Sequence, residues 1–157
     1  MKNNWLWVFN QNLWTPNGVY VIQDSKAEGR NAEFDANRLE KMLKGGKEFN
    51  GIRFSKDGSV RFAPKGSYKL GNNTPESLAK DGFMIAGYGL EGAEKLGEAS
   101  AKFARKPYIY GLNIQEGQDN ELRVSALNVY FNGGRLSVGG YGWCGDGDFG
   151  RAFGVSA

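Results

Sequence analysis

The N-terminal part of the chain contains two short apolar stretches, residues 5–9 and 19–22, with polar residues between them. Both stretches are rich in Trp, Val, Tyr or Phe, which are residue types that favour strands. Thr15-Pro-Asn-Gly18 precedes the second stretch, and its proline and glycine supply the backbone angles that tight turns need. This pattern predicts an opening β-hairpin.

A helical pattern follows between Asp35 and Lys44. Leu39, Met42 and Leu43 are spaced i, i+3, i+4, so they share one face of a helix. Asp35 is a favourable N-cap, and the two glycines after Lys44 favour a helix end. We expect a helix that buries this apolar face.

Two further elements are indicated between residues 51 and 80. Residues 51–64 alternate apolar and polar side chains around Lys56-Asp57-Gly58, which predicts a second hairpin. Thr74-Pro75-Glu76 has the composition of a helix start, with a capping threonine and a proline in the first turn. We therefore expect a short helix that ends at Lys80.

The rest of the chain supplies one more helix and several strands. Phe83–Ala86 is a short apolar run and is predicted to be a strand. Residues 90–104 have a helical pattern with small residues on one narrow face, which we expect to pack closely onto a sheet. Strands are expected at 108–114 and 122–131. This order of elements predicts an α+β fold with a single domain over residues 1–157.

Composition narrows the possible functions. The chain has no histidine and only one cysteine, which excludes histidine-based catalysis, histidine metal ligands and intrachain disulfides. The formal charge of +3 does not indicate a nucleic-acid partner. No signal peptide or membrane span is expected, because the apolar runs are too short, and the compartment stays open. We expect no enzymatic activity and no cofactor.

Gly87-Tyr-Gly89-Leu-Glu-Gly92 matches the dinucleotide fingerprint G-x-G-x-x-G. It follows the strand expected at 83–86 and begins the next expected helix, and Glu116 lies roughly where a ribose-binding acid is expected. A small nucleotide-binding or NAD-dependent enzyme that uses Gly87, Gly89 and Gly92 is therefore the alternative function. Because only one βαβ unit is visible, we expect these glycines to form a packing turn.

Other chemically suggestive residues have simpler interpretations. Asp146 and Asp148 offer too few oxygens for Mg²⁺ or Ca²⁺, so no metal site is expected. Cys144 has no histidine to activate it, so an ordinary cysteine is expected. Alternating aromatic residues lie on the expected strands, namely Trp5, Trp7, Tyr108, Tyr110 and Phe131. Stacking of bases or sugars on these rings is one interpretation, but core packing is the default expectation.

The C-terminal segment uses an unusual set of residues. From Leu122 to Ala157 there is no Lys, Glu, Gln or Met. Asn, Tyr, Ser, Gly, Cys, Asp, Phe and Arg instead interrupt a more regular skeleton at irregular spacing. That skeleton comprises Gly133, Arg135, Leu136, Val138, Gly139, Trp143 and residues 151–155.

This segment resembles the variable region of diversity-generating retroelement proteins, of which the archaeal branch is one candidate. In that family an error-prone reverse transcriptase randomises adenines, mainly in Asn codons. The resulting codons include those of Tyr, Asp, Ser, Cys, Gly, Phe and Arg but not that of Trp, so Trp143 is assigned to the constant framework. The chain departs from the best-known branch because it lacks a clear Gly-Gly-Ser-Trp motif. An ordinary glycine-rich β segment is the other interpretation.

The resemblance implies a C-type lectin-like fold with antiparallel strands, two or more helices, and glycine-rich C-terminal strands and loops. The first and last strands pair in that fold. It also implies a variable region at about residues 128–152 that binds a macromolecular target, expected to be a protein. The implied ligand-binding residues, expected in one exposed patch, are Tyr130, Asn132, Tyr141, Cys144, Asp146, Asp148, Phe149 and Arg151. The residues expected to be mostly buried are Leu136, Val138, Trp143, Phe153 and Val155.

Overall fold

The computed structural model describes residues 4–23, 35–129, 134–141 and 150–152. Within them the strands are β1 (Asn4–Thr15), β2 (Gly18–Ile22), β3 (Lys47–Phe49), β4 (Ile52–Phe54), β5 (Val60–Pro64), β6 (Gly71–Asn72), β7 (Tyr108–Tyr110), β8 (Glu121–Val129), β9 (Leu136–Tyr141) and β10 (Gly150–Ala152). The helices are α1 (Ala36–Leu43), α2 (Pro75–Lys80) and α3 (Gly82–Ser100). This combination of helices with mostly antiparallel strands confirms the α+β class.

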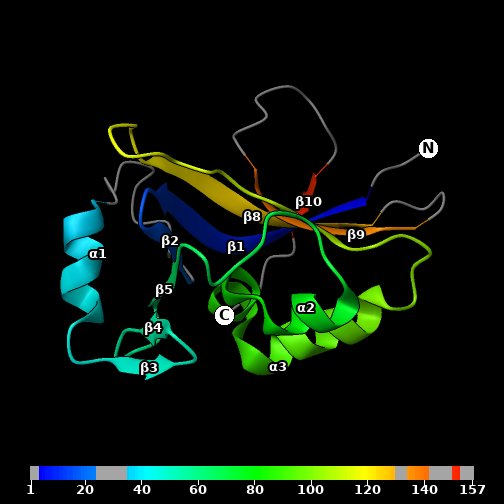
Figure 1. Cartoon of the computed structure of the whole chain (residues 1–157), viewed down its shortest axis with the longest axis horizontal. Helices are drawn as coiled ribbons and strands as arrows, with labels where there is room; N and C mark the ends of the chain where they lie inside the picture. The colour runs from blue at the N-terminus through cyan, green and yellow to red at the C-terminus, as the bar shows by residue number, and fades with distance from the viewer. Residues whose placement is uncertain (1–3, 24–34, 130–133, 142–149, 153–157) are drawn as a thin grey trace.

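The centre of the sheet is β1, which forms hydrogen bonds along both of its edges (Figure 1). β8 runs antiparallel to it from Asn4 to Trp14. Residues 11–15 also pair antiparallel with β2, and residues 5–7 pair parallel with β10, so these two strands share the edge opposite β8. The remaining order is β3-β4-β5-β2-β1-β8-β9-β7-β6, in which only β7 and β9 are parallel. The first and last described strands are therefore neighbours.

Both predicted hairpins are confirmed. β1 and β2 are joined by a tight turn in which the Thr15 hydroxyl donates to the Gly18 carbonyl oxygen at 2.9 Å. Gly18 is required there, because a Cβ would lie 2.3 Å from the carbonyl oxygen of Ala63. β4 and β5 form the second hairpin. The edge strands β3 and β6 were not predicted.

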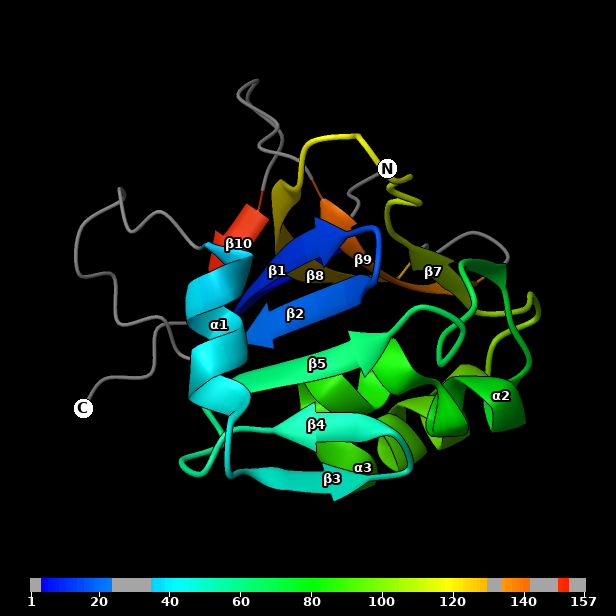
Figure 2. The same cartoon turned by 60° about the vertical axis from the view of Figure 1, so that its left-hand side comes forward.

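Helices cover the two faces of the sheet unequally. Figure 2 shows α1 in front of β2 and β5, with α3 behind β4 and β5. The core on the α3 side is the larger one, and it includes Trp14, Val19, Phe83, Met84, Ile109 and Val138. The core under α1 comprises Leu13, Tyr20, Ile22, Leu39, Leu43, Val60 and Phe62.

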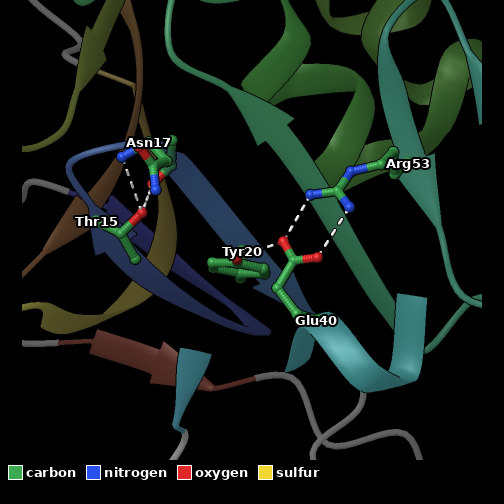
Figure 3. A network of polar contacts seen from close by, with 6 residues as sticks. Thr15, Asn17, Tyr20, Glu40 and Arg53 are labelled. Atoms are coloured by element: carbon green, nitrogen blue, oxygen red, sulfur yellow. Dashed lines mark hydrogen bonds and ion pairs between the residues drawn. The ribbon is translucent and has the colours of Figure 1, made fainter. Parts of the chain in front are cut away.

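A polar cluster holds α1 on the sheet (Figure 3). Glu40 of α1 accepts a hydrogen bond from the Tyr20 hydroxyl at 2.6 Å and two from the Arg53 guanidinium at 2.9 and 2.6 Å. The bonds from Arg53 lower the pKa of Glu40, so the carboxylate stays ionised. The predicted apolar face is only partly correct, because Leu39 and Leu43 are buried whereas Met42 is 40% exposed.

The strand predicted at Phe83–Ala86 is wrong, because these residues form the first turns of α3. Asp81 caps the helix by accepting from the backbone N–H groups of Phe83 and Met84 at 3.0 and 3.2 Å. Its other carboxylate oxygen accepts from the Lys69 N–H at 2.8 Å. A short run that is buried on all sides has no distinguishing periodicity, so the cap decides the structure. Burial raises the pKa of Asp81 to about 6, although its hydrogen bonds favour the ionised form.

α3 is interrupted at Gly89, whose φ of 74° and ψ of 171° are not helical. Glycine adopts such angles without steric cost. The carbonyl groups freed at this interruption are satisfied by side chains from the sheet. The Gly87 carbonyl oxygen accepts from Asn10 and Gln23, each at 2.8 Å, and the Ala86 carbonyl oxygen accepts from Arg61 at 3.1 Å. A guanidinium at a helix C-terminus also complements the helix dipole.

Among the small residues of α3, Ala93 lies in the core shared with the sheet as predicted, whereas Gly97 packs against α2. A Cβ on Gly97 would lie 2.7 Å from the Pro75 carbonyl oxygen and 2.8 Å from the Ala79 Cβ. The helix also ends at Ser100, earlier than predicted. None of the helices in the described part of the chain has both the length and the apolar character needed to cross a membrane.

The two aspartate caps should differ in their contribution to stability. Asp81→Ala leaves buried backbone N–H groups without acceptors and should lower the free energy of unfolding by about 2–4 kcal/mol. Asp35→Ala removes the one hydrogen bond that the exposed cap accepts from the Asn37 N–H. It should lower the free energy of unfolding by only about 0.5–1 kcal/mol. Urea denaturation of both variants measures the difference. Equal losses would contradict the buried role of Asp81.

Candidate binding surface on strands β7 and β9

The two faces of β9 carry different kinds of residue. Leu136 and Val138 are 4% and 0% exposed and belong to the core on the α3 side. Successive side chains of a strand point to opposite faces, so Ser137 and Gly139 lie on the other side of the sheet. The predicted burial of Leu136 and Val138 is confirmed. Trp143, Phe153 and Val155 lie outside the described residues.

β7 places two tyrosines beside this second face of β9. Tyr108 pairs with Ser137 and Tyr110 with Gly139, while Ile109 pairs with Val138 and is buried. The two tyrosine rings are 4.4 Å apart between centroids. Gly139 allows this packing, because a Cβ there would lie 2.5 Å from the Tyr110 Cβ. The result is a half-buried aromatic pair beside β9.

Arg135, directly before β9, adds a positive charge to this pair. Its guanidinium carbon lies 4.7 Å from the centre of the Tyr108 ring, a cation–π geometry. One of its nitrogens also lies 3.4 Å from the Tyr110 hydroxyl. Within the described residues Arg135 forms no ion pair. We call Tyr108, Tyr110, Arg135, Ser137 and Gly139 together the β7–β9 face.

Ser137 is the one polar side chain of the β7–β9 face that is fully buried, beside the buried Gly139. Its hydroxyl oxygen has no hydrogen-bond partner among the described residues. A buried polar group without a partner costs about 1–3 kcal/mol.

Six of the eight predicted ligand-binding residues lie outside the described residues: Tyr130, Asn132, Cys144, Asp146, Asp148 and Phe149. Tyr141 ends β9, opposite Val124, and Arg151 is the middle residue of β10, opposite Leu6. The side chains of Tyr141 and Arg151 also lie outside the described part. β8 and β1 separate β9 from β10, which puts the two strands about 14 Å apart. A single patch containing all eight residues thus stays a prediction.

The glycine motif does not have the context that a dinucleotide site requires. Gly87, Gly89 and Gly92 lie within α3, and the strand expected before them is helical. The Gly87 carbonyl oxygen is instead used to bind the side chains of Asn10 and Gln23. Within the described residues no group of three or more acidic or cysteine side chains could hold a metal ion.

The sequence pattern does not predict that the residues of the β7–β9 face lie together. It indicates core packing for Tyr108 and Tyr110, and it places Arg135 in the regular skeleton of the tail. The alternation Tyr-Ile-Tyr at 108–110 indicates such a face, because it directs the apolar Ile109 inward and the two amphipathic tyrosines to the other side of the strand. The parallel pairing of β7 with β9 could not be inferred from either segment alone.

The close packing at Gly139 predicts a contrast between two glycine substitutions. Gly139→Ala forces a Cβ against Tyr110 and should lower the free energy of unfolding by about 1–3 kcal/mol. In Gly87→Ala the new Cβ meets no atom within 4 Å, so stability should change by less than about 1 kcal/mol. Thermal unfolding of the two variants is the measurement. An unchanged midpoint for Gly139→Ala would show that Tyr110 is not packed on Gly139.

No protein-family model, curated protein or solved structure matches the chain.

Proposed function

We propose that this chain is a ligand-binding protein with a C-type lectin-like fold that presents a diversified C-terminal surface. The variable region covers about residues 128–152, as in the variable proteins of diversity-generating retroelements. Its target is a macromolecule, and a protein is favoured. The activity is binding without catalysis.

The observation that carries this proposal is that the two faces of β9 carry different kinds of residue. Leu136 and Val138 anchor the strand in the core, while Ser137 and Gly139 belong to the β7–β9 face. The two buried side chains hold the backbone of β9 in place, which supports variation at residues beyond Gly139.

The topology supports a link between the variable region and the constant part of the chain. β10 pairs with β1, so the strand on each side of residues 142–149 is hydrogen-bonded into one sheet. Pairing of the first and last strands is also what the C-type lectin-like fold implies. A segment whose two ends are held by the same sheet is a suitable place for variable side chains.

The residue types fit a binding surface that must accept different partners. Tyr and Phe offer rigid contact area, while Ser, Gly, Asn and Asp make adaptable polar contacts, as in antibody paratopes. The β7–β9 face adds fixed tyrosines and an arginine, which are frequent among the residues that dominate binding energy. The proposed surface thus combines diversified and constant contacts.

Stability after substitution tests this division of roles. Exchange of Tyr141, Asp146, Asp148 and Phe149 together for serine should change the free energy of unfolding by less than about 2 kcal/mol. The matched core variant, Leu136→Ala with Val138→Ala, should lose about 4 kcal/mol or more, because both side chains are buried. Denaturant unfolding followed by circular dichroism compares the two.

Selection from a library then tests binding itself. We expect a library randomised at the eight predicted positions to yield binders to several unrelated purified proteins. A second library, randomised at eight exposed positions of α1 and α3, provides the control. A fourfold serine variant that unfolds, or equal yields from the two libraries, would refute the proposed function.

A further inference from the structure

The loop that follows α3 lies against the start of β9. The backbone N–H of Arg105 donates to the Gly134 carbonyl oxygen at 3.2 Å. The Phe103 ring packs so closely on Gly134 that a Cβ there would lie 2.7 Å from the ring. The Pro107 carbonyl oxygen accepts from the Asn73 N–H at 2.8 Å, which fixes the end of the loop. These contacts hold the loop at the margin of the β7–β9 face.

This margin is positively charged. Lys102, Arg105 and Lys106 are exposed, and Arg135 is partly exposed. Residues 99–115 contain no Asp or Glu, and the same is true of β6 and β9, the neighbours of β7. In the described part of the chain, none of the four cations forms an ion pair. We call Lys102, Arg105, Lys106 and Arg135 the basic corner.

We propose that the basic corner, together with Tyr108, is a constant docking site for an acidic protein surface. This inference rests on the proposed function and adds the chemistry of the partner. None of these residues is among the eight predicted diversified positions. The docking contact is therefore shared by all versions of the tail, and the diversified residues add specificity beside it.

The geometry of Arg135 suits a carboxylate partner. Its guanidinium is held over the Tyr108 ring, which restrains the fork of N–H groups before a ligand arrives. A carboxylate can accept two parallel hydrogen bonds from such a fork. The exposed side chains of Lys102, Arg105 and Lys106 add long-range attraction, which raises the association rate of an acidic partner.

The number and setting of the charges favour a protein over a nucleic acid. Nucleic-acid binding commonly neutralises about 6–10 phosphates, whereas the basic corner offers four cations. Glu94 and Glu98 lie on the exposed side of α3 immediately before Lys102. These acids would repel a phosphate backbone that extended past the corner, but not a compact acidic patch.

Binding of a fluorescent glutamate oligopeptide, measured by anisotropy at low salt, tests the docking site. Reversal of three charges in Lys102→Glu, Arg105→Glu and Lys106→Glu should raise Kd about tenfold or more. The matched control is Arg38→Glu, Lys41→Glu and Lys44→Glu, on exposed positions of α1 and its C-cap, with the same change in charge. It should raise Kd less than about threefold, because salt screens distant charges.

A conservative variant separates geometry from charge. Arg135→Lys keeps the charge but removes the flat fork, and it should weaken binding several-fold without changing the circular dichroism spectrum. No binding by the wild type, or equal losses from both charge reversals, would overturn the docking site. The comparison ligand is an oligothymidylate of equal length. If it binds more tightly than the peptide and depends on the same residues, the partner is a nucleic acid and not a protein. Stability of the fourfold serine variant is independent of this experiment, so the two proposals can fail separately.

Discussion

The hydrogen bonding of β1 along both edges is the constraint on which the rest of the structure depends. β8 occupies one edge over nearly the whole strand, and β2 and β10 share the other (Figure 1). A single strand thereby joins the N-terminal hairpin to the C-terminal strands on either side of residues 142–149. Because every backbone group of a central strand needs a partner, displacement of β1 would disturb both parts of the sheet.

An irregularity in β1 connects this sheet to α3. The pairing register with β8 shifts between Trp7 and Gln11, and Asn10, within that interval, donates to the Gly87 carbonyl oxygen of α3. Nearby, the buried side chains of Asn12 and Ser125 are hydrogen-bonded to each other. Buried polar groups that are hydrogen-bonded to each other favour one arrangement of the packed elements over alternative arrangements. The bond from Asn10 holds α3 on the sheet, and the loop that follows α3 brings Lys102, Arg105 and Lys106 to the start of β9.

The sequence predicts local elements well and long-range relations poorly. Turn and cap residues such as Asp35, Thr74 and Gly18 correctly mark the helices and hairpins, because their effects involve only neighbouring residues. The run Phe83–Ala86 was misassigned, since burial on all sides removes the periodicity that distinguishes helix from strand. The β7–β9 face depends on pairing between segments separated by a long stretch of chain. No local pattern indicates that Arg135 would lie over Tyr108.

In the proposed function the C-terminal tail varies, whereas the sheet that holds it stays constant. Sequencing of the coding DNA and its neighbourhood across many cells of one population shows whether the tail varies. We predict a near-copy of the tail's coding sequence, a nearby reverse-transcriptase gene, and changes restricted to codons aligned with adenines of the copy. The changing codons should include most of positions 130, 132, 141, 144, 146, 148, 149 and 151, and those of Leu136 and Val138 should stay constant. A single invariant tail with no near-copy, or changes spread evenly along the chain, would contradict the claim.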